Sequence, residues 1–63
     1  MDQLFTAEYP LEAQIDCVKR EIRMRELVYP GRVAKGKMKP GKCRQEIECM
    51  QAVLATLEGL RGK

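Results

Sequence analysis

The sequence predicts an all-α fold, an antiparallel hairpin of two helices joined by a short connection that contains a helical turn. Apolar residues recur at spacings of three and four along residues 10–28 and 40–58, which is typical of amphipathic helices. Prolines and glycines gather in residues 29–39 and indicate a turn-rich connection. Helices of about nineteen residues joined this closely pack side by side in opposite directions. We expect residues 1–9 to form a flexible N-terminal arm and residues 10–63 to form the hairpin.

The first predicted helix begins at Pro10, because proline is tolerated in the first turn of a helix. Its main apolar stripe follows at spacings of four, three, four and seven. Acidic residues near the start and basic residues toward the end suit the helix dipole. Pro30 is expected to stop or bend this helix at about Val28. The stripe consists of Leu11, Ile15, Val18, Ile22 and Tyr29.

The connection leads into the second predicted helix. Residues 32–35 are expected to make one helical turn, with Gly36 as its C-terminal cap. Pro40 then opens the second helix, and Gly59 or Gly62 ends it. The main apolar stripe repeats at spacings of four, three, four and three, and consists of Cys43, Ile47, Met50, Leu54 and Leu57.

A second apolar stripe runs along each helix, well away from the main one. A lone hairpin would leave these stripes in water, and contiguous exposed apolar patches usually mark an interface. The alternative is that the Pro30–Gly36 segment and the N-terminal arm, with Leu4, Phe5 and Tyr9, fold back over them. We expect an interface, because such short pieces would cover one face but hardly both. The predicted interface residues are Cys17, Met24, Leu27, Val28, Cys49, Val53 and Leu60.

The size of the chain also favours association. A folded chain of 7.2 kDa buries about 60% of its unfolded surface, which contributes on the order of 90 kcal/mol at ~25 cal/mol/Å². Ordering the chain costs about 1.5 kcal/mol per residue, which is again on the order of 90 kcal/mol. Because the two cancel, the hairpin needs a disulfide, a metal or a second chain. The simplest closed solution is a symmetric dimer that forms a four-helix bundle.

The cysteines do not supply the missing stability. Cys17, Cys43 and Cys49 are an odd number and too few for a disulfide scaffold. There is no histidine and no zinc-motif spacing, so we interpret the three as small buried apolar residues and expect no metal. No secretory signal is expected, and no apolar run approaches the ~18 residues of a membrane span, which favours a reducing cytoplasm.

No catalytic site is predicted. Histidine, the commonest general base, is absent. Cys43, which lies between Lys42 and Arg44, is the one candidate for a lowered thiol pKa, and we interpret it as a packing residue. A chain of this size has little capacity to enclose a water-excluding site, so we expect no enzymatic activity and no cofactor.

The predicted connection and the start of the second helix are strongly basic. Between Arg32 and Arg44 there are six cations and no acidic residue, in a chain whose net charge is +3. Backbone N–H groups at the start of the second helix point into the same region, which suits a phosphate or carboxylate. The segment lacks the Gly-x4-Gly-Lys-Ser/Thr spacing, so nucleotide hydrolysis is excluded. It is either solvated surface or an anion-binding surface. The cations are Arg32, Lys35, Lys37, Lys39, Lys42 and Arg44.

Residues 23–38 and 46–58, about half of the chain, resemble small uncharacterised proteins encoded in tailed-bacteriophage and prophage genomes. The resemblance comes from Val-Tyr-Pro, then Arg-Val-Ala-x-Gly-x-Met, then a helix that ends Ala-Val-Leu-Ala-Thr-Leu-Glu. Such proteins have no known activity, so the resemblance assigns no functional residue. It implies a small accessory protein that acts in the cytoplasm of a bacterial host by stoichiometric binding.

Three hypotheses follow. The first is a homo-oligomer, most simply a dimer, that docks on a host protein as an inhibitor or counter-defence adaptor. The second is an anion binder that holds nucleic acid or a phosphorylated small ligand at the basic segment. It ranks below the first because aromatic residues are sparse and the net charge is modest. The third is a structural or assembly component of a phage particle.

Overall fold

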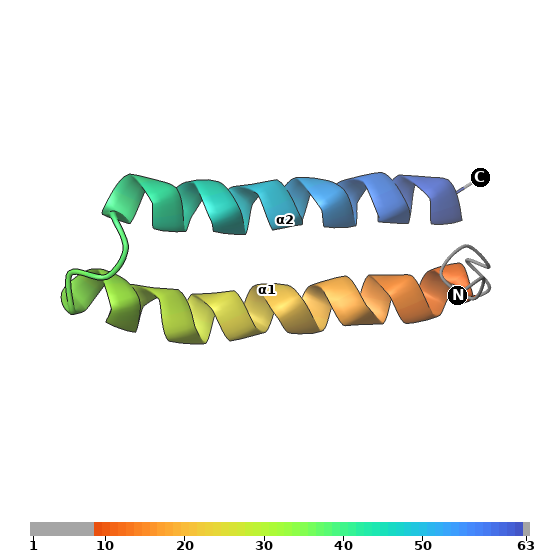
Figure 1. Ribbon diagram of the computed structural model, residues 1–63. Coiled ribbons are helices and arrows are strands. Elements are labelled where there is room, and N and C mark those ends of the chain that lie inside the picture. Colours follow the sequence, from red (N-terminus) through yellow and green to blue (C-terminus); the bar gives the residue numbers. More distant parts are fainter. Residues whose placement is uncertain (1–8, 63) are drawn as a thin grey trace, which may run out of the picture.

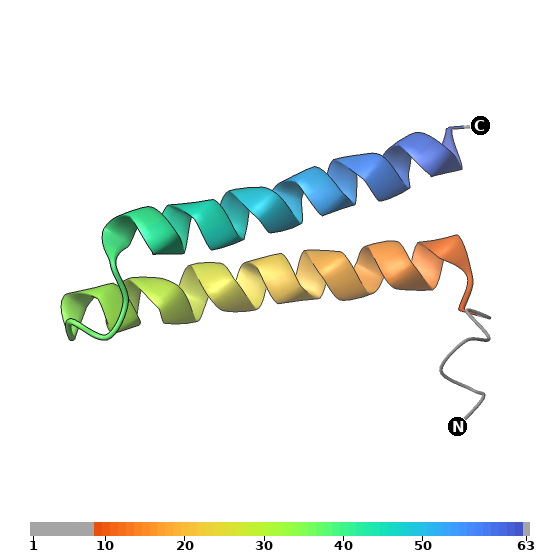
Figure 2. The same ribbon diagram turned by 45° about the horizontal axis from the view of Figure 1, so that its top comes forward.

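A computed structural model describes residues 9–62 of the chain. These residues form two α-helices, α1 (Leu11–Ala34) and α2 (Pro40–Arg61), which run antiparallel and side by side (Figures 1 and 2). Within this described part there is no strand. The predicted all-α hairpin is therefore confirmed. Apart from Tyr9, the predicted N-terminal arm lies outside the described residues.

The first helix is longer than predicted, because it continues through Pro30 to Ala34. The predictions of an end near Val28 and of a separate turn at residues 32–35 are wrong. Proline removes only one backbone donor, the N–H that would reach the carbonyl of Glu26, and Glu26 is exposed to water. Beyond Pro30, Val33 extends the main apolar stripe and is half-buried, so packing favours continuing the helix.

Gly36 was predicted to cap a separate turn at residues 32–35; it follows the end of α1 instead, in the left-handed region with φ of +75°. Its N–H donates to the carbonyl of Val33 at 3.0 Å, and the N–H of Lys37 donates to the carbonyl of Arg32 at 2.8 Å. This pair of hydrogen bonds is the Schellman motif, which satisfies two carbonyls at the end of the helix. Glycine suits the position because it has no Cβ to oppose a positive φ.

The second helix begins with Pro40 as its first residue, as predicted. Lys39 is the N-cap residue and makes no side-chain capping hydrogen bond. The helix passes through Gly59 and ends at Arg61, so Gly62 is the terminating glycine of the two proposed. The result is a helix of 22 residues facing one of 24 residues across the hairpin.

The two main apolar stripes face each other between the helices. Ile15 and Ile22 are the only buried residues among residues 9–62, with exposures of 0% and 8%. The other stripe residues are half-buried: Leu11, Val18, Tyr29, Cys43, Ile47, Met50, Leu54 and Leu57. The main stripes therefore form the core, and that core is narrow.

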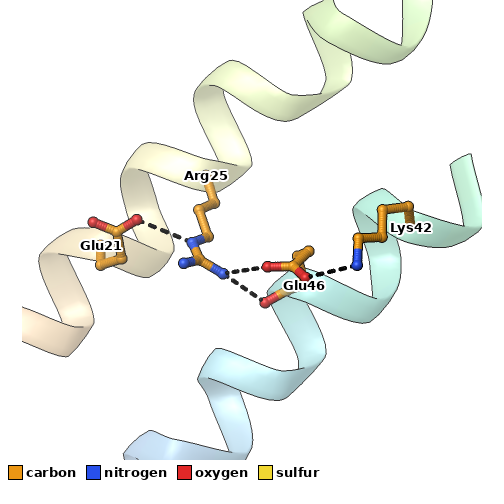
Figure 3. Close-up of polar contacts among 4 residues, drawn as sticks. All are labelled: Glu21, Arg25, Lys42 and Glu46. Carbon is orange, nitrogen blue, oxygen red and sulfur yellow. Dashed lines mark hydrogen bonds and ion pairs between the residues drawn. The ribbon is translucent and has the colours of Figure 1, made fainter. Parts of the chain in front are cut away.

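Polar contacts across the hairpin set the register of the helices. Arg25 on α1 donates from Nη1 to the carbonyl oxygen and to Oε1 of Glu46 on α2, at 3.0 Å and 3.2 Å (Figure 3). Its Nε donates to Oε2 of Glu21 at 3.0 Å, while Lys42 approaches the other oxygen of Glu46 at 3.2 Å. Near the free ends of the helices, Arg61 pairs with Glu12 at 3.0 Å.

Candidate protein-interaction surface

All seven residues of the predicted interface are exposed. The five large ones are Leu27 at 74%, Leu60 at 54%, Met24 at 53%, Val28 at 42% and Val53 at 40% exposed. Cys17 and Cys49 are exposed as well. The second stripes therefore lie outside the core that the main stripes form.

A shallow groove of about 600 Å³ joins the second stripes of the two helices. Its lining residues from α2 are Val53 and Leu57. Because Cys17 of the second stripe of α1 and Val53 of the second stripe of α2 line one groove, the two stripes meet on one side of the hairpin at this level. The remaining lining residues are Tyr9, Ala13, Gln14, Cys17 and Val18. We call this side the apolar face, made of the groove together with Met24, Val28, Cys49 and Leu60; Leu27 lies at its outer edge.

The opposite side of the hairpin is polar. A helix turns by about 100° per residue, so Ala55 lies nearly opposite Val53 on α2, and Arg23 lies well away from Met24 on α1. Most of the exposed residues on this side are charged, and both signs are present. They are Glu12, Asp16, Lys19, Arg23 and Glu26 on α1, and Arg44, Glu48, Gln51 and Ala55 on α2. The hairpin thus has one polar face and one face on which apolar side chains gather around the groove, beside the exposed side chains of Arg20 and Glu21.

The hairpin does not cover its own apolar face with its connection. Residues 30–34 continue α1, so they cannot fold back over the groove as the alternative interpretation required. Tyr9 lines the groove at its edge and is itself 75% exposed. Leu4 and Phe5, the other residues of that alternative, lie outside the described residues.

The predicted basic segment forms one end of the hairpin, and all six of its cations are exposed. A groove of about 460 Å³ is lined by Arg32, Lys35 and Lys37 together with Val28 and Gly31. An adjoining groove of about 430 Å³ is lined by Lys37 and Lys39, among others. We call this region the basic end, made of Arg32, Lys35, Lys37, Lys39, Lys42 and Arg44.

Two of these cations already have contacts within the hairpin. Lys42 pairs with Glu46, and the guanidinium of Arg32 lies 5.9 Å from the ring centroid of Tyr29. Arg44 lies on the polar side of α2 and lines neither groove. The structure therefore gathers Arg32, Lys35, Lys37 and Lys39 rather than the whole predicted set.

The cysteines differ from one another. Cys43 is half-buried in the main stripe of α2, as expected of a packing residue. The interpretation of Cys17 and Cys49 as buried residues is wrong, because both belong to the second stripes and are exposed. The Sγ of Cys17 accepts a hydrogen bond from Arg20 at 3.5 Å. Within residues 9–62 no three His, Cys, Asp or Glu side chains gather in a way that would hold a metal ion.

The sequence reasoning missed the contact between Arg25 and Glu46. Arg25 occupies the gap of seven residues between Ile22 and Tyr29 in the main stripe, so its position already indicated that it faces α2. Its hydrogen bond to the Glu21 carboxylate raises the pKa of Arg25, burial opposes this rise, and the charges of Glu21 and Glu46 add to it.

Neither of the two helices is long and apolar enough to cross a membrane. No family model, no curated protein and no solved structure matches the chain.

Proposed function

We propose that this chain is a non-catalytic interaction protein that binds another protein stoichiometrically through its apolar face. The observation that supports the proposal is the placement of the second stripes of both helices on one exposed side, around one groove. Apolar surface gathered in this way is typical of a docking surface. Grooves and faces on helical hairpins bind other helices by packing apolar side chains at helical spacing.

The narrow core supports the same conclusion. With Ile15 and Ile22 as the only buried residues in the described part, the hairpin has little apolar burial of its own. A partner that covers Met24, Val53 and Leu60 would add apolar burial comparable to that core. Binding would then stabilise the fold as well as carry out the function.

Co-purification from bacterial cells tests this proposal. A tagged chain is produced beside an untagged copy, and the proteins that co-purify, the untagged copy included, are quantified. We expect a stoichiometric partner that is lost in Met24→Glu and Leu60→Glu. The matched controls Arg23→Glu and Ala55→Glu, on the polar side of the same helices, should retain it. If no protein co-purifies above background, or if face and control variants behave alike, the proposal is wrong.

The basic end supports a second candidate function, the binding of an acidic partner. Arg32, Lys35 and Lys37 line one groove, and no acidic residue does so. The resemblance to phage accessory proteins favours a host protein as this partner, which the chain would inhibit or recruit as an adaptor. Nucleic acid or a phosphorylated ligand is the alternative with the same charge requirement.

A salt-dependent titration separates these partners. Fluorescence anisotropy with labelled duplex DNA, RNA and a nucleotide at low salt should give binding that falls steeply with salt, if a phosphate is the ligand. Lys35→Glu and Lys37→Glu should abolish it, whereas Lys19→Glu on the polar side of α1 should not. A flat titration with every probe would eliminate the nucleic-acid and nucleotide alternative and leave an acidic protein.

A further inference from the structure

We propose that the partner covering the apolar face is a second copy of this chain, related by a two-fold axis that places the two basic ends at opposite ends of a four-helix dimer. This inference rests on the proposed function, because it names the occupant of the same face. It goes further by fixing which helices meet and which residues lie next to the axis.

The exposed area suits an interface between two copies. The five large side chains of the predicted interface are 40% to 74% exposed. Covering the four that belong to the apolar face, all but Leu27, together with Tyr9 at 75% exposed and with Cys17 and Cys49, removes on the order of 300 Å² of apolar surface per copy, at about 100 Å² for a whole side chain. With the groove lining, and with polar atoms forming about 40% of a typical interface, two copies would bury about 1,000 Å². A specific interface needs about this area.

The distribution of charge selects the arrangement. The cations of the basic end gather where α1 ends and α2 begins, whereas the apolar groove lies toward the free ends of the helices. In a dimer with both basic ends at the same end of the bundle, the two sets of cations would lie close together and repel each other. Turning one copy end for end keeps the basic ends apart while the two apolar grooves still overlap.

The register of the hairpin then locates the axis. The contacts between Arg25 and Glu46 and between Arg61 and Glu12 fix which residues of the two helices lie abreast. Cys17 and Val53 line the same groove and lie near the middle of the apolar face. An axis perpendicular to the helices at this level packs α1 on α1 and α2 on α2, each pair antiparallel. The Val53 side chains of the two copies then meet, and Ala13 lies opposite the partner copy's Met24, a small residue against a large one.

The first experiment measures mass by light scattering across a concentration series. We expect the wild-type chain at twice its 7.2 kDa mass. Val53→Glu places two carboxylates next to the axis, so the dissociation constant should rise by at least about 100-fold. Ala55→Glu, two residues away on the polar side of α2, should leave it unchanged. A dimer that Val53→Glu and Ala55→Glu weaken equally would overturn the inference.

Disulfide trapping tests the arrangement without relying on a destabilised variant. In a Cys17→Ser background, Val53→Cys should form an interchain disulfide between the two introduced thiols on mild oxidation, identified by peptide mass mapping. Ala55→Cys in the same background should not. With both basic ends on one side, Val53 would face the partner copy's α1 instead, and no such disulfide would form. Its absence from a dimer would therefore overturn the arrangement.

A monomer at every concentration would overturn the inference, and the reactivity of Cys17 would then decide the proposed function. Rapid alkylation of Cys17 in the folded monomer would mean that the apolar face is open, so it would remain a docking surface for a different protein. Protection of Cys17 in a monomer would mean that the chain covers this face itself. Both the inference and the proposed function would then be wrong.

Discussion

Among single residues between 9 and 62, Ile15 is the side chain most completely removed from water, with an exposure of 0%. Replacing it with alanine should lower the free energy of unfolding by about 2–5 kcal/mol, because the narrow core cannot collapse around the lost atoms. Ile15→Val should cost about 1 kcal/mol, since it removes a single methylene. Urea unfolding followed by circular dichroism measures both. Equal midpoints for the wild type and Ile15→Ala would mean that the packing between the helices contributes little to stability.

Arg25 joins the two helices by polar contacts, as Arg61 does near their free ends, and its planar group donates to Glu21 and Glu46 at once. Arg25→Lys keeps the charge and loses this geometry, so the melting temperature should fall by several degrees. The raised pKa of Arg25 adds stability that is present below its ordinary pKa and lost only as the pH rises beyond the raised value. The contribution of the Arg25 charge to stability is therefore lost only at strongly alkaline pH.

We therefore expect the difference between Arg25→Lys and the wild type to stay constant from about pH 6 to 9, in which both side chains remain charged. Thermal unfolding at several pH values measures this difference. Lys19→Arg, on the polar side of the same helix, is the matched control and should leave the melting temperature unchanged. A melting temperature of Arg25→Lys equal to that of the wild type would mean that the forked contact adds no stability.

At the scale of the elements, α1 tolerates a proline in its interior. Pro30 leaves the carbonyl of Glu26 without a backbone donor, so Pro30→Ala should raise the free energy of unfolding by about 1–3 kcal/mol. Pro10→Ala should change it by less than about 0.5 kcal/mol, because Pro10 is the N-cap residue and removes no helical hydrogen bond. Chemical unfolding compares the two variants. A Pro30→Ala variant no more stable than the wild type would show that another feature of the helix end offsets the restored bond.

Replacing Gly36 and Gly59 by alanine should change the free energy of unfolding in opposite directions. Gly36 has a φ of +75°, so Gly36→Ala should destabilise the hairpin by about 1 kcal/mol. Gly59 lies inside α2 with no atom within 4 Å of an added Cβ, so Gly59→Ala should stabilise it by about 0.5–1 kcal/mol. The same unfolding measurement gives both signs. A neutral Gly36→Ala would mean that the end of α1 rearranges without this turn.

The spacing of apolar residues in the sequence predicted some features of the two helices and missed others. The stripes from Leu11 to Tyr29 and from Cys43 to Leu57 predicted both helices, but the sequence left open which of the two stripes on each helix faces inward. The end of α1 was mispredicted because the local penalty of Pro30 was weighed without the packing of Val33 beyond it. The candidate surface was predicted as two separate stripes. That they share one groove depends on the register, which the sequence alone did not reveal.

At the scale of the whole molecule, the hairpin buries only Ile15 and Ile22 among residues 9–62, so we expect its stability to depend on what covers the apolar face. If a second copy covers the apolar face, folding and dimerisation become one equilibrium, and stability must rise with protein concentration. Each tenfold increase should add about 1.4 kcal/mol to the free energy of unfolding per dimer, visible as a higher urea midpoint. Ala55→Glu should keep this dependence, and Val53→Glu should lose it together with most of its stability. A midpoint that does not change over a hundredfold range of concentration would mean that the hairpin folds alone, and that Ile15, Ile22 and the contacts of Arg25 are sufficient to hold it.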